Sequence, residues 1–150
     1  MADESDILLE IWKEQRAQLR QTEHQRTQLT HIVILVVAAG LGFIAQKGLR
    51  PSAVVVTLPM TFLGLYGALA CLKYRERSAL HAAQSQLFRG KLSALHPDLE
   101  IESGWANTYR NQQSRFPKLF KIRLYVLWLT LHVGVAAIGI TLTLWALADG

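Results

Sequence analysis

Three apolar stretches without a single Asp, Glu, Lys or Arg constrain this chain more than any other feature: residues 29–46, 52–72 and 124–148. They contain 18, 21 and 25 residues. As helices they would cover about 27, 32 and 38 Å of a hydrocarbon layer roughly 30 Å thick. The two polar segments, 1–28 and 73–123, are each small for an independent hydrophobic core. The sequence therefore predicts an all-α integral membrane protein with three transmembrane helices, and it argues against a soluble enzyme.

The distribution of charge predicts the orientation in the membrane. The net charge is +5, and segment 73–123 alone has ten Lys and Arg against four Asp and Glu. Because Lys and Arg are retained on the cytoplasmic side, we expect this segment and the N-terminus inside and the C-terminus outside. Lys47 and Arg50, in the short outer link, oppose this orientation mildly. Topology thus accounts for the charge, and we expect no nucleic-acid partner.

Residues 1–28 predict a cytoplasmic helical stalk that runs into the first span, since no Pro or Gly separates the two. Its apolar stripe gives way to glutamines, and two interpretations stay open. In the first, the stalk lies on the membrane surface with Trp12 as an interfacial anchor. In the second, it packs against copies of itself through amide hydrogen bonds across a seam. The seam would contain Gln18, Gln21 and Gln25.

The other segments predict short connections within a single membrane domain over residues 1–150. Pro51 suits the first turn of the second span and predicts a tight hairpin with the first span. Pro59 lies inside the second span, where its ring removes a backbone hydrogen bond and kinks the helix, so it is a candidate hinge. Segment 73–123 predicts two helices that form a cytoplasmic hairpin, with a turn at Pro97.

The sequence contains no arrangement typical of catalysis. The five histidines are not paired at metal-ligand spacing, and there is no serine elbow, phosphate-binding glycine loop, cysteine cluster or acidic pair within an apolar stretch. We therefore predict that the protein is not an enzyme and has no cofactor or metal. His132 lies inside the third span and is expected to face inward. It either forms a hydrogen bond with Thr130, Thr57 or a backbone carbonyl, or it lines a water-filled path.

Small residues recur four apart in the spans and flatten helix faces, so that another backbone can approach closely. The pairs are Ala38 and Gly42, Gly64 and Ala68, Gly67 and Cys71, and Gly139 and Thr143. Packing of the three spans within one chain is one use for these faces. Because three short spans offer little internal interface, we favour the other use, self-association into a homo-oligomer.

After the second span the chain leaves the membrane with the motif KYRER, whose Lys73, Tyr74, Arg75 and Arg77 suit the headgroup region. With the polar N-terminal helix, the tight hairpin and the amphipathic helix after the motif, residues 5–95 resemble the SLATT group of small bacterial membrane proteins. The resemblance implies an effector of nucleotide-signalled antiviral defence, which assembles in the inner (plasma) membrane and damages it when a partner signals. The third span departs from the two-span pattern of that group.

The resulting hypothesis is a multi-pass, self-associating, non-enzymatic membrane protein that forms a pore or disrupts the bilayer. A cytosolic regulatory protein is expected as a partner in addition to the lipid bilayer. The alternative is a membrane adaptor or scaffold that presents the helices of 73–123 to a soluble partner and forms no pore. A small transporter or channel subunit is less favoured, because the spans contain no Asp, Glu, Lys or Arg.

Overall fold

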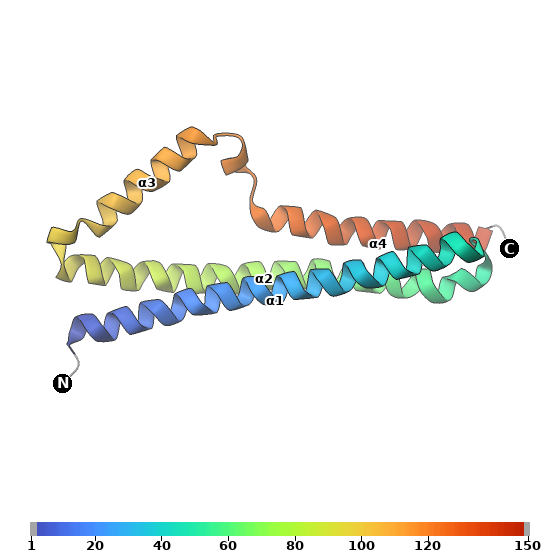
Figure 1. Cartoon of the computed structure of the whole chain (residues 1–150), viewed down its shortest axis with the longest axis horizontal. Helices are drawn as coiled ribbons and strands as arrows, with labels where there is room; N and C mark the ends of the chain where they lie inside the picture. Colours follow the sequence, from blue (N-terminus) through green and yellow to red (C-terminus); the bar gives the residue numbers. More distant parts are fainter. Residues whose placement is uncertain (1–2, 149–150) are drawn as a thin grey trace. The chain divides into compact units, whose positions relative to one another are not determined.

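The computed structural model describes residues 3–148, and these form helices joined by short connections, without a strand (Figure 1). The all-α prediction is confirmed. Three of the helices have the length and apolarity needed to cross a bilayer, as the sequence predicted. In chain order the elements are α1 (Glu4–Lys47), η1 (Pro51–Ala53), α2 (Val54–Leu95), η2 (Pro97–Leu99), α3 (Ile101–Arg115), η3 (Leu119–Lys121) and α4 (Leu124–Ala148).

The 44-residue helix α1 contains the polar stalk and the first apolar stretch without a break, which confirms the predicted continuous helix. Glu4 and Asp6 lie in its first turn, where the helix dipole favours negative charge. The helix ends at Gly48, whose φ of 79° is accessible at low cost only to glycine. The amide of Gly48 donates to the carbonyl of Ile44 over 2.8 Å and closes the last turn.

Prolines set the boundaries of the next elements. Pro51 opens η1, and α2 then runs for 42 residues, straight through Pro59. Pro97 follows the end of α2 and begins η2, at the turn predicted from the sequence. Glu100 precedes α3 in the left-handed conformation, with φ 46° and ψ 35°. The second polar helix predicted for segment 73–123 is therefore α3.

The chain divides into two compact units. We call residues 24–75 and 124–148 the apolar unit, and residues 3–23 and 76–123 the polar unit. Each of the long helices α1 and α2 contributes one part to each unit.

Within the apolar unit, the interior is small and closely packed. Val33, Val37, Met60 and Val135 form its buried apolar cluster. Many large apolar side chains face outward, among them Val55 at 78% exposure. An apolar exterior of this kind is compatible with a multi-pass membrane protein.

Within the polar unit, α1 and α2 are held together by a few polar contacts. The Oε1 atom of Gln15 accepts a hydrogen bond of 2.7 Å from Nδ1 of His81, and the hydroxyl of Ser5 lies 2.8 Å from Nε2 of His96. Ser85 is buried in this unit. These cross-helix contacts use side chains that the sequence pattern did not single out.

Candidate functional site

The apolar unit contains a layer of polar groups that its three helices bring together. Arg26 and Thr30 come from α1, Gly67 comes from α2, and Trp128 and His132 come from α4. Arg26 is 8% exposed, and Thr30 and His132 are fully buried. We call these five residues the polar layer.

His132 occupies a notch in α2 that exists because residue 67 is glycine. A Cβ built on Gly67 would lie 2.5 Å from Cε1 of His132, 2.7 Å from Cγ and closer still to Nδ1. Ordinary contact begins at 3.4 Å, so any side chain at position 67 would displace the ring. The close approach of backbone and ring is what small residues permit between membrane helices.

Thr30 is the hydrogen-bond partner of His132, with 3.2 Å between Oγ1 and Nε2. The inward orientation expected from the sequence is confirmed, but the partner residues named there were wrong. Thr130 instead donates within its own helix to the carbonyls of Val126 and Leu127. Sequence reasoning missed Thr30 because its position, two residues into the first apolar stretch, gives no indication of which helix it faces.

Thr30 links His132 to the backbone of α1. Thr30 Oγ1 donates to the carbonyl of Arg26 over 3.0 Å, as threonines in helices often do. Which atom donates in the Thr30 to His132 contact depends on the imidazole tautomer. The Nδ1 atom of His132 is buried and has no hydrogen-bond partner among the described residues.

Arg26 is the charged member of the polar layer. Its guanidinium carbon lies 5.2 Å from the centre of the Trp128 ring, within the range of a cation–π interaction. Arg26 Nε and Trp128 Nε1 are both buried, and neither has a hydrogen-bond partner within residues 3–148. A buried donor without an acceptor costs about 1–3 kcal/mol. The sequence placed Arg26 in the stalk, and only the helix packing places it inside the unit.

A second polar contact lies further along α2 and α4. Thr143 Oγ1 donates to Thr57 Oγ1 and to the carbonyl of Gly139, over 2.7 Å in each case, so that one proton serves two acceptors. A Cβ on Gly139 would lie 2.5 Å from Oγ1 of Thr61. Thr57 was one of the partners proposed for His132, but it pairs with Thr143. The interior of the apolar unit therefore contains several hydrogen-bonded threonines beside its apolar cluster.

The small residues predicted to mediate association fall into two groups. Gly64 packs on α4 within the chain, since a Cβ there would lie 2.8 Å from Cα of Ala136 and 2.9 Å from its Cβ. Ala68 is half-buried. Ala38 and Gly42 are exposed, and nothing lies within 4 Å of a Cβ built on Gly42. The first group is used inside one chain, and the second is open to a partner.

The predicted seam residues of the stalk make no contact across helices that the structure records. Gln18 donates to Oε1 of Glu14, one turn earlier in α1, over 2.7 Å. Gln21 is exposed and Gln25 is half-buried. Trp12 is also half-buried, so both interpretations of the stalk remain predictions.

The hinge and interface candidates are mostly at the surface. Pro59 is exposed inside an unbroken α2, and its hinge role stays a prediction. Of the KYRER residues, Tyr74 is half-buried and Lys73, Arg75 and Arg77 are exposed. The guanidinium of Arg75 lies 3.9 Å from the centre of the Tyr125 ring, at the start of α4.

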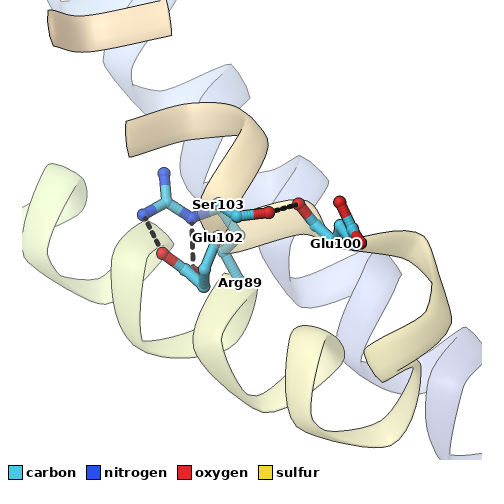
Figure 2. Close-up of polar contacts among 4 residues, drawn as sticks. All are labelled: Arg89, Glu100, Glu102 and Ser103. Carbon is cyan, nitrogen blue, oxygen red and sulfur yellow. Dashed lines mark hydrogen bonds and ion pairs between the residues drawn. The ribbon is translucent and has the colours of Figure 1, made fainter. Parts of the chain in front are cut away.

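The polar unit has its own cluster, which holds the start of α3 against α2. Arg89 forms a two-pronged ion pair with Glu102, with Nε–Oε1 at 2.9 Å and Nη2–Oε2 at 3.0 Å (Figure 2). The same guanidinium lies 4.4 Å from the centre of the Trp105 ring. Ser103 Oγ donates to the carbonyl of Glu100 over 2.9 Å, beside the ion pair (Figure 2). Arg is suited to such a site because its planar fork matches a carboxylate and stacks on an indole.

Neither cluster resembles a catalytic or metal centre. Among the described residues, no group of three or more His, Cys, Asp and Glu could hold a metal ion. The five residues of the polar layer include no carboxylate and no cysteine. What the layer offers is a buried cation and three polar atoms that lack partners.

Comparison of the chain with protein-family models, with curated proteins and with solved structures finds no match. Three features of the chain bear on its function: the polar layer, the open face of α1 at Ala38 and Gly42, and the polar unit.

Proposed function

We propose that this chain is a non-enzymatic, multi-pass protein of the inner (plasma) membrane that self-associates and permeabilises or disrupts the bilayer. In this proposal α1, α2 and α4 span the membrane, the N-terminus is cytoplasmic and the C-terminus is outside. The polar unit is then cytoplasmic and is the part that a regulatory partner would contact.

The observation that carries the proposal is the polar layer inside an apolar unit. Arg26, Trp128 and His132 each have a buried polar atom without a partner. Ionisable groups within membrane helices are expensive, and they tend to face a bundle interior or a water-filled cavity. A rearrangement that lets water reach these atoms would recover part of that free energy. The unpartnered atoms therefore lower the free-energy cost of opening the interior of the unit to water.

The face available for assembly is the outer side of α1 at Ala38 and Gly42. Gly64, Gly67 and Gly139 are filled by α4 or by α2 of the same chain. Gly42 is open, so a second copy of α1 can approach it closely without displacing the packing inside the chain. This support does not extend to Gly64, Gly67 and Gly139, whose faces are already occupied within the chain.

The test replaces Gly42 by Leu and measures assembly and membrane damage together. The added side chain should hold neighbouring helices apart and weaken each contact by about 1–2 kcal/mol. Gly134→Leu is the matched control, because Gly134 in α4 also has nothing within 4 Å of a built Cβ. Cross-linking in membranes and mass measurement in mild detergent report assembly, and loss of membrane potential after induced expression reports damage.

The expected result is that Gly42→Leu lowers assembly and damage in parallel, while Gly134→Leu changes neither. A wild-type chain that is monomeric in membranes, or a Gly42→Leu variant that assembles as before, would refute self-association through α1.

A second candidate, a membrane adaptor, is favoured by one observation in the polar unit. None of the residues of α3 is buried, and Trp105 and Tyr109 are 48% and 61% exposed. An adaptor would leave growth and membrane potential unaffected on induced expression, and a stable complex with a soluble protein would be recovered. Those two outcomes together would replace the effector proposal.

A further inference from the structure

We infer that residues 103–123 dock on the anionic lipid headgroups of the leaflet in which α4 begins. We call these residues the basic aromatic segment. The inference does not depend on self-association, since it concerns a different part of the chain and a different partner.

The charge of the segment points to an anionic partner. Residues 103–123 contain five cations and no Asp or Glu. The nearest acid before the segment, Glu102, is neutralised by its ion pair with Arg89 (Figure 2). The cations are Arg110, Arg115, Lys118, Lys121 and Arg123.

Apolar and aromatic side chains on the same segment point to lipid rather than to a soluble polyanion. Trp105 and Tyr109 lie four residues apart on α3, and Phe116 directly follows that helix. Leu119 begins η3 and Ile122 directly follows it. Leu119 is 66% exposed and Ile122 is 51% exposed. Clustered cations with exposed aromatic and aliphatic side chains are typical of segments that lie in a membrane interface.

The segment is held in shape before any lipid binds. Its start is fixed to α2 by Arg89, which pairs with Glu102 (Figure 2). The same guanidinium lies over the Trp105 ring. The two halves of the segment meet through Tyr109 and Phe120, whose rings are 4.9 Å apart at 82°. Between them lies a shallow hollow of about 360 Å³ lined by Gly104, Trp105, Thr108, Tyr109, Gln112 and Phe120. A preformed surface binds with less loss of conformational entropy than a disordered one.

Connectivity places the segment at the membrane surface. Arg123 is joined directly to Leu124, the first residue of the apolar helix α4. When α4 spans the bilayer, the residues immediately before Leu124 must lie at the headgroups. Lysines and arginines within a Debye length of an anionic leaflet gain about 1 kcal/mol each.

The test uses the full chain, in a Cys71→Ala background, with a nitroxide on Leu119→Cys. The protein is reconstituted in vesicles of phosphatidylcholine alone and in vesicles with about 30 mol% phosphatidylglycerol. Oxygen and a water-soluble nickel chelate then report whether the label contacts lipid or water. We expect lipid contact that requires phosphatidylglycerol and that falls as salt rises from about 0.05 to 0.5 M.

Two charge variants make the test specific. Lys118→Gln with Lys121→Gln should lower the ratio of lipid-exposed to water-exposed label roughly 25-fold, about fivefold per charge. Arg16→Gln with Arg20→Gln removes the same charge from exposed positions of α1 and should leave the ratio unchanged.

Four outcomes would overturn the inference: a label in water on both lipids, equal lipid contact without phosphatidylglycerol, equal loss in both charge variants, or a label shielded from both quenchers by protein. Gly42→Leu is measured in parallel. A Gly42→Leu variant that assembles as before and still docks would refute only the self-association proposal, and lost assembly in a chain that shows no docking would refute only the docking.

Discussion

Gly67→Ala is the substitution that tests the packing of the polar layer most directly. The new methyl would lie 2.5 Å from Cε1 of His132 and closer still to Nδ1, where ordinary contact begins at 3.4 Å, so the ring and α2 must separate by at least about 0.9 Å. The Thr30 to His132 contact is already 3.2 Å long. A shift of that size in the wrong direction carries it beyond hydrogen-bonding distance.

The expected loss of stability combines two terms. Overpacking a closely packed interior costs about 1–3 kcal/mol, and the lost hydrogen bond adds about 1 kcal/mol. Alanine is the better helix former, which offsets up to about 1 kcal/mol of this. We therefore expect the free energy of unfolding in mixed micelles to fall by about 1–3 kcal/mol, measured by denaturant titration followed by circular dichroism.

Two comparisons make this prediction refutable. Gly134→Ala is the same substitution in a helix of the same unit, but a Cβ there meets nothing within 4 Å, so stability should hold or rise slightly. In a His132→Ala background the ring is absent and the methyl on residue 67 has room, so the penalty of Gly67→Ala should disappear. Two results would show that the notch at Gly67 does not hold α2 and α4 together. One is an equal change in the free energy of unfolding for Gly67→Ala and Gly134→Ala. The other is an unchanged penalty of Gly67→Ala in the His132→Ala background.

Three other predictions concern orientation and the polar unit. The first tests the orientation with the N-terminus inside, using single cysteines in a background without Cys71. Ser103→Cys should be protected from an impermeant thiol reagent added to intact cells, and Ser52→Cys should react with it. Reversed labelling would refute this orientation. Glu100 has φ 46°, a left-handed conformation that glycine adopts at lower cost, so Glu100→Gly should relieve backbone strain. Hydrogen exchange should then show amide protection of α3 raised by up to about 1 kcal/mol. Lower protection would contradict the presence of strain at residue 100. Arg89→Lys should lower that protection by roughly 0.5–1 kcal/mol, because a lysine cannot reproduce the two-pronged pair or the stacking; unchanged exchange would mean that the ion pair does not hold α3.

Much of the fold follows from local properties of the sequence. Apolar stretches free of charge predict helices of spanning length, and Pro51 and Pro97 mark element boundaries through backbone geometry alone. The continuity of α1 follows from the lack of Gly or Pro between stalk and first apolar stretch. Each of these features is determined by residues that are neighbours in the chain, so one sequence is enough to predict it.

The composition of the polar layer depends on contacts between residues far apart in the chain, which is why the sequence predicted less of it. His132 could be expected to face inward, because a polar ring in a span needs a partner. Its choice of Thr30, 102 positions earlier, depends on how α1 and α4 rotate about their axes. Small residues likewise predict a close approach but not which helix approaches. Gly64 and Gly42 look alike in sequence, and only the first is filled.

The dependence of His132 on Gly67 and Thr30 imposes an order on biosynthesis. A ribosome completes the hairpin of α1 and α2 first, and the notch at Gly67 then stands open with Thr30 beside it. Only after the 28 residues between Leu95 and Leu124 does α4 begin to emerge, with its imidazole further on. A helix entering lipid alone would expose that ring to hydrocarbon, whereas a helix entering against the finished hairpin finds Thr30 already in place. In the proposed membrane protein, the earlier hairpin would be the template on which the final segment is inserted.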